Sequence, residues 1–198
     1  MSGIYQTTVA SSAFLLVSDG FVQGTITGKF PDRYALEGGV VASTQATPIY
    51  GGLPLSLAVN TPSTMGSSGL GEAIKLATAE TNIDGWCLFD QASAGVISAF
   101  SNVPLYYANM SANFVRTGSS AWIVLPVNPS AVNTIAGGAS NQTLYWNFTN
   151  NYVDITGTGP LPVQVINLSI TSKTVTYAAG PPITANWAAG GSVIVVQF

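Results

Sequence analysis

The sequence predicts an all-β fold: a β-sandwich, jelly roll or barrel of many short antiparallel strands, with at most one short helix. Two observations carry this prediction. Short runs of β-branched and aromatic residues recur along the chain, and Gly, Pro and Asn separate one run from the next. The 198 residues are enough for one domain with a substantial hydrophobic core.

The first half of the chain contains candidate strands at residues 21–27, 39–45, 49–59, 85–89, 95–97 and 103–107. Residues 61–71 have no apolar period and are rich in Gly, Ser and Thr, so we expect an exposed loop there. Residues 71–81 are the only candidate helix, because Ala, Leu, Lys and Glu favour helical backbone. They could equally form a strand that ends before Asn82.

The second half contains candidate strands at residues 114–116, 121–127, 143–148, 162–170, 173–177 and 192–198. Residues 128–142 between them are rich in Gly, Asn and Ser. We therefore expect a single β-rich domain over residues 13–198, with 128–142 as a candidate boundary between two β subdomains. The polar residues 1–12 are a candidate N-terminal arm.

The composition argues against several classes of function. Only 7% of the residues are charged, where an average soluble domain has about 25%. The chain has no His and one Cys, which excludes histidine triads, His-rich metal sites and an intramolecular disulfide. Five basic residues and a net charge of −3 argue against nucleic-acid binding. The apolar runs are too short to span a membrane. So little charge instead predicts a component of an assembly, with much of its surface buried against partners.

No motif predicts a cofactor or an enzyme. Gly24 and Gly28 before Lys29 have the wrong spacing for a phosphate-binding loop, and we expect these glycines at a turn or bulge. No His is present to activate a serine, and we expect Cys87 to be a core residue. The eight carboxylates are expected in loops and salt bridges; for example, Asp32-Arg33 and Glu37 could pair across a turn. A glycosidase would need two of them to face each other in a cleft.

Aromatic residues gather in the later part of the chain, and they allow two interpretations. They are Tyr106, Tyr107, Trp122, Tyr145, Trp146, Phe148 and Tyr152. Side chains alternate between the two faces of a strand, so half of them are expected in the core, and the rest at a subunit interface. The alternative is an exposed aromatic strip that stacks on sugar rings.

Four segments of strands and glycine turns carry a resemblance to a known family. They are residues 35–43 followed by 48–54, residues 114–126, residues 144–149 followed by 161–163, and residues 187–198. In this order they resemble the small structural cement, or capsid decoration, proteins of tailed bacteriophages. The resemblance spans about residues 35–198.

The resemblance implies a β-rich protein on the outer surface of the virion that bridges subunits of the major capsid protein. Neighbouring copies of the chain would contact each other as a dimer or trimer. The family has no catalytic residues. Such a protein is made in the host cytoplasm, and the N-terminus accordingly has no basic region ahead of an apolar one, so we expect no signal peptide.

We therefore expect a non-enzymatic capsid decoration protein that stabilises the assembled shell by binding it. The residues expected at its interfaces are Tyr5 and Gln6 in the arm, Phe30, Tyr34 and Tyr50 near turns, and Phe198 at the end of the last strand. The alternatives are a glycan-binding module of a virion tail or spike, another virion component such as a baseplate protein, and a fragment of a glycoside hydrolase.

Overall fold

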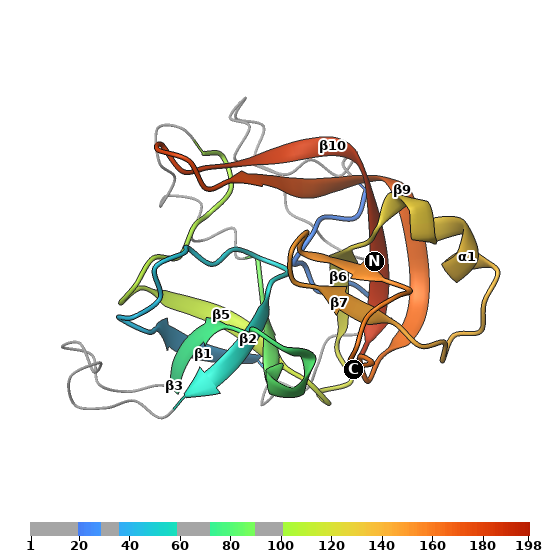
Figure 1. Cartoon of the computed structure of the whole chain (residues 1–198), viewed down its shortest axis with the longest axis horizontal. Helices are drawn as coiled ribbons and strands as arrows, with labels where there is room; N and C mark the ends of the chain where they lie inside the picture. Colours follow the sequence, from blue (N-terminus) through green and yellow to red (C-terminus); the bar gives the residue numbers. More distant parts are fainter. Residues whose placement is uncertain (1–19, 29–35, 59–71, 90–100) are drawn as a thin grey trace.

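The computed structural model describes residues 20–28, 36–58, 72–89 and 101–198. Over these residues the chain is all-β, as predicted, with a small closed barrel, a three-stranded sheet and a two-stranded sheet. Figure 1 shows the barrel on one side of the molecule and the three-stranded sheet on the other. The order of the strands in the chain follows this division, because the barrel uses β1–β5 and the sheets use β6–β10.

The barrel closes in the order β1-β3-β2-β4-β5. Its strands are β1 (Leu36–Val41), β2 (Pro54–Ala58), β3 (Glu72–Leu76), β4 (Gly85–Cys87) and β5 (Ser111–Arg116). Every pairing is antiparallel except that of β1 with β3, which is parallel. A small apolar core that includes Val41, Ile74 and Phe114 fills the barrel.

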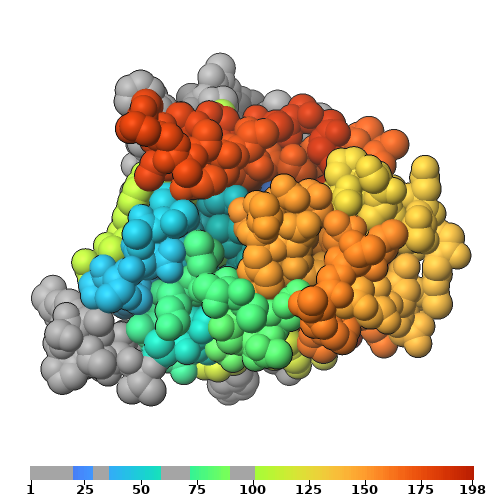
Figure 2. Space-filling view, viewed as in Figure 1, coloured from blue at the N-terminus to red at the C-terminus, as the bar shows by residue number. Residues whose placement is uncertain are grey.

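The three-stranded sheet has the order β6-β10-β9. Its strands are β6 (Trp122–Pro126), β9 (Gln164–Ala178) and β10 (Thr184–Gln197). β9 and β10 form one long hairpin that bends where its register shifts, between Ala188 and Val193 on β10. Beyond the bend the hairpin continues as a two-stranded ribbon that crosses the molecule toward the barrel (Figures 1 and 2).

Hydrogen bonds hold the far part of this hairpin in place. The backbone N–H of Ala185 donates to Oγ of Ser101 at 2.9 Å, and that of Val103 donates to the Ala185 carbonyl at 3.2 Å. Oε1 of the buried Gln23 accepts from the N–H of Val175 at 3.0 Å. The segment before the barrel therefore pairs with the last hairpin of the chain.

Part of the segment 128–142 is helical, and this is where the structure differs most from the sequence prediction. They contain the 3-10 turn η4 (Pro129–Ala131) and α1 (Val132–Ala136). Asn128 caps this segment by accepting from the N–H of Ser130 at 3.0 Å. The prediction of a helix at 71–81 is wrong, and its strand alternative is confirmed: β3 is followed by a single 3-10 turn, η2 (Glu80–Asn82). Pairing with β1 and β2 overrides local helix propensity there.

Most of the predicted strands are present, with different lengths. The predicted strands at 162–170 and 173–177 are one continuous β9. Residues 21–27 form a turn with two isolated bridges, at Val22 and Ile26. β7 (Tyr145–Asn147) and β8 (Tyr152–Asp154) form a short hairpin. β7 lies in the predicted strand 143–148, and β8 is a strand that the sequence did not predict. Three predicted segments lie outside the described residues: the strand 95–97, the loop 61–71 and the arm 1–12.

The largest core lies between the barrel and the sheets. It joins Trp86 of β4 and Val115 of β5 to Leu125, Trp146 and Ile194 of the other strands. The rings of Trp86 and Trp146 meet edge to face with their centroids 5.0 Å apart. The residues before and after 128–142 thus share one apolar core.

Candidate functional site

The outer surface of β9 is the first candidate site. Ser172 is the one buried residue among the fifteen of this strand. Ile170 is 63% exposed and Ile166 is 36% exposed, and they are two of four exposed large hydrophobic residues in the described part of the chain. An exposed apolar pair on an edge strand is typical of a surface that binds another protein.

β-Bulges explain why both isoleucines face outward. Val195 pairs with Asn167 and Val196 pairs with Val165, so Ile166 between them has no partner on β10. A second shift leaves Ile170 and Thr171 opposite the single residue Ser192. Each bulge interrupts the alternation of side chains, which turns an isoleucine away from the core.

The edge of β9 is also partly closed to further backbone pairing. The N–H of Leu168 donates to Oδ1 of Asn167 at 2.8 Å, and the N–H of Thr171 donates to Oγ of Ser169 at 3.4 Å. Together with the bulges, these local bonds disfavour the addition of another strand. A partner would therefore contact the isoleucine side chains rather than extend the sheet.

Charge is distributed very unevenly along the chain. Residues 117–198 contain two charged side chains, Asp154 and Lys173. Asp154 is buried, and its carboxylate accepts from Nδ2 of Asn128 at 3.0 Å and from the N–H of Ile155 at 2.8 Å. β9 carries Lys173 as its one charged side chain and β10 carries none, so the surface around them is built mostly from neutral polar and apolar side chains, as the core of a protein interface is.

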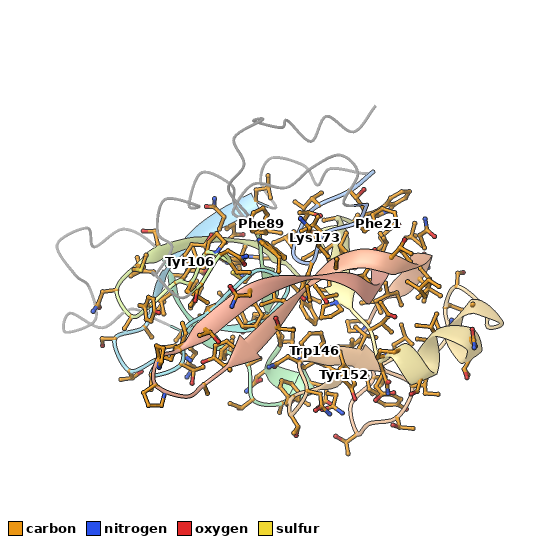
Figure 3. All side chains as sticks on the ribbon, turned by 90° about the horizontal axis from the view of Figure 1, so that it is seen from above. Phe21, Phe89, Tyr106, Trp146, Tyr152 and Lys173 are labelled. Atoms are coloured by element: carbon orange, nitrogen blue, oxygen red, sulfur yellow. The ribbon has the colours of Figure 1, made fainter. Side chains whose placement is uncertain are left out.

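A pocket of about 430 Å³ is the second candidate site. It lies beside the bend of the β9–β10 hairpin, between the end of β6 and the turn that joins β7 to β8. Tyr50, Tyr152 and Tyr177 contribute to its lining. In Figure 3, Trp146 and Tyr152 lie on the opposite side of the hairpin from Phe21.

Two of the six residues predicted at interfaces fall within the described part of the chain. Tyr5, Gln6, Phe30 and Tyr34 lie outside it. Tyr50 is 3% exposed and its ring centroid is 5.6 Å from that of Tyr177, so it presents little surface to a partner protein. Phe198 is half-buried and stacks on Trp86 at 5.5 Å. Both rings face the core. The sequence pattern places them beside turns, but it does not show which way they point.

Glu37, Glu72 and Asp84, like Asp154, bind groups of the chain itself. Glu37 of β1 and Glu72 of β3 both bind the guanidinium of Arg116 on β5, with Nη2 at 2.9 Å and 2.6 Å from their oxygens. Hydrogen bonds to Glu37, and then to Glu72, raise the pKa of Arg116. Asp32 and Arg33, the expected partners of Glu37 across a turn, lie outside the described residues, and the partner that the structure gives Glu37 is Arg116 of β5. Oδ2 of Asp84 accepts from the N–H of Leu57 at 2.8 Å.

The predicted core position of Cys87 is confirmed, because it is fully buried in the barrel. Of the seven aromatic residues of which half were expected in the core, Tyr106 and Trp146 are buried. Gly24 has a φ of 80° at a turn, as expected, and a Cβ there would lie 2.6 Å from Cα of Gly51. In the described ranges, no group of three or more Cys, Asp or Glu side chains could hold a metal ion. No helix among these residues is long and apolar enough to cross a membrane.

The sequence did not identify Ile166 and Ile170 as exposed. Both lie in the predicted strand 162–170, where strict alternation makes no provision for bulges. Searches against models of protein families, curated proteins and solved structures find no match to this chain.

Proposed function

We propose that this chain is a capsid decoration protein of a tailed bacteriophage, which binds the outside of the assembled shell and clamps neighbouring capsid subunits. The observation that carries the proposal is the outer surface of β9, where Lys173 is the one charged side chain and two isoleucines are exposed. The resemblance of residues 35–198 to cement proteins supports the same function. A clamp of this kind requires buried contact area and no acid–base chemistry.

The contact is made by side chains that lose water on binding. Ile170 is 63% exposed, so a shell subunit that covers it gains the burial of most of its aliphatic surface, about 1–2 kcal/mol per copy. Binding to the shell alone lowers the free energy of that state and raises its melting temperature. Many copies on one shell add these contributions.

Cosedimentation with capsids tests the proposal directly. Purified protein is mixed with mature shells of the virus that encodes it, after removal of the bound copies, and with unexpanded proheads. We expect saturable binding to mature shells and a higher shell melting temperature. The variant Ile170→Asp should weaken binding about tenfold or more, because it places a charge where the contact is apolar.

Leu36→Asp is the matched control. Leu36 is 43% exposed on β1 of the barrel, so this variant makes the same chemical change on a different surface. It should bind like the wild type. Absence of binding to mature shells would refute the decoration function. Equal binding by Ile170→Asp and the wild type would exclude the β9 surface as the contact.

A further inference from the structure

The pocket beside the hairpin bend has an uncharged polar lining. Its polar members are Gln23, Tyr50, Thr149, Asn150, Asn151, Tyr152, Thr174, Tyr177 and Ser192. The described lining includes no charged side chain. A ligand with a formal charge would lose its hydration there without gaining a counter-charge, which is strongly unfavourable. The lining therefore selects neutral ligands.

The volume and position of the pocket suit a small molecule. About 430 Å³ lies within the range of about 300–1,000 Å³ that small-molecule pockets occupy. Its walls come from Gln23 and Tyr50, from the end of β6, from the β7–β8 turn and from both strands of the hairpin. A site that several elements build together is held in shape by their packing.

Some of the lining groups are already engaged, and others remain for a ligand. The amide of Gln23 is used on both sides, since Nε2 donates to the Gly51 carbonyl at 3.1 Å and Oε1 accepts from Val175. Gln23 is therefore a wall of the pocket. The hydroxyl of Tyr152 accepts from Nδ2 of Asn150 at 3.2 Å, which leaves its own hydrogen to donate to a ligand.

The half-buried rings of Tyr152 and Tyr177 supply apolar faces beside these polar groups. The buried ring of Tyr50 packs against Tyr177 at 32° and supports it. Tyrosine hydroxyls are neutral at physiological pH, and burial raises the pKa of both of these further. The side chain of Asn151, which has a φ of 55° in the β7–β8 turn, hydrogen-bonds to the Tyr50 hydroxyl. An aromatic face next to amide and hydroxyl groups matches a sugar ring, which has apolar C–H faces and a rim of hydroxyls.

We propose that this pocket binds a neutral mono- or disaccharide, with the Asn150–Tyr152 pair hydrogen-bonded to its hydroxyl groups and the half-buried rings of Tyr152 and Tyr177 against its C–H face. The proposal is independent of the decoration function. A protein that displays such a pocket on an assembled particle would attach that particle to surface glycans.

Saturation-transfer NMR on the full chain tests the proposal. The probes are glucose, galactose, N-acetylglucosamine, cellobiose and chitobiose, with glucuronic acid and glucosamine as charged comparisons. We expect saturation transfer to at least one neutral sugar, mainly through its C–H protons, and weaker transfer to the charged ones. The double variant Asn150→Ala/Tyr152→Phe should raise the Kd of that sugar about tenfold, because it removes two polar contacts from the pocket.

Tyr145→Phe is the control, since it removes a tyrosine hydroxyl on β7 that does not line the pocket. It should leave the Kd unchanged. Circular dichroism checks that each variant is folded, and Tyr152→Phe alone serves if the double variant is not. No transfer to any neutral sugar, tighter binding of the charged sugars, or an unchanged Kd in the folded pocket variant would overturn the proposal.

Discussion

At the scale of single residues, burial decides the chemistry of the reactive side chains. Cys87 is the only cysteine of the chain, and its thiol lies in the barrel core with no exposed surface. Its sulfur is 3.7 Å from the Leu88 carbonyl, which is a weak contact. Burial in apolar surroundings raises the pKa of the thiol, so the reactive thiolate is not formed at neutral pH.

We predict that the Cys87 thiol is inert in the folded protein. A disulfide reagent such as 5,5′-dithiobis(2-nitrobenzoate) should react at pH 8 at least about 100-fold more slowly with the native chain than with the chain in guanidinium chloride. The absorbance of the released thiolate measures both rates, and the single cysteine makes the assignment unambiguous. Equal rates in the two states would contradict the burial of this side chain.

At the scale of elements, backbone geometry at the hairpin bend connects the sheet to the rest of the fold. Gly190 has a φ of 76°, a conformation that favours glycine. A Cβ on Gly191 would overlap Oγ1 and Cγ2 of Thr174 and lie 2.9 Å from its Cβ. Rotation of Thr174 about χ1 would not relieve this, because its Cβ stays in place.

We therefore expect Gly191→Ala to destabilise the fold by about 1–3 kcal/mol through overpacking at the bend. Gly180→Ala is a matched control at the tip of the same hairpin, where a Cβ would have no neighbour within 4 Å and φ is not in the left-handed region. It should change stability by less than about 0.5 kcal/mol. Urea denaturation followed by tryptophan fluorescence measures both. A loss in Gly180→Ala as large as that in Gly191→Ala would show that the bend is not the sensitive position.

Local pattern was sufficient to predict most of the strands but not their pairing. The apolar runs that include β2, β5, β6 and the end of β10 are visible in the sequence because strand residues repeat with a period of two. The parallel pairing of β1 with β3 was not predictable, since it depends on contacts between segments that are distant in the chain. The same limit applies to η4 and α1, where Pro129 and the Asn128 cap start a helical segment inside a polar stretch.

The candidate sites were less predictable than the fold. The exposure of Ile170 follows from a bulge, and a bulge is set by the register of two strands rather than by the type of any residue. The tyrosine pocket joins Tyr50 to Tyr152 and Tyr177, which are more than 100 residues away in the chain. Their aromatic character was visible in the sequence, but their convergence depends on the whole fold.

At the scale of the whole molecule, the scarcity of charge shapes how stability responds to pH. The chain contains no His, so no side chain has a usual pKa between about 5 and 8. Cys87 and Tyr50 have usual pKa values of 9.0 and 10.0, and burial raises both in the folded protein. The unfolded chain therefore loses these protons at a lower pH than the folded chain.

The free energy of unfolding should be nearly constant between about pH 6 and 8. The contributions of Cys87 and Tyr50 are fully present below pH 9, and stability should fall as the pH rises further, by about 1.4 kcal/mol per pH unit for each group. Urea titrations at a series of pH values measure this curve. In Cys87→Ala the decline should begin about one pH unit higher. Stability that increased above pH 9 would contradict the assigned burial.

The hydrogen bond between Gln23 and Val175 joins two segments that are made at different times during synthesis. The barrel strands are complete once Arg116 has left the ribosome, but the amide of Gln23 has to wait for Val175, about 60 residues later. At about 5–20 residues per second this interval lasts roughly 3–12 s. Throughout that time Tyr50 lacks Tyr177 and Trp86 lacks Phe198, their ring partners in the finished fold. The nascent chain therefore exposes apolar surface to chaperones until the last hairpin emerges.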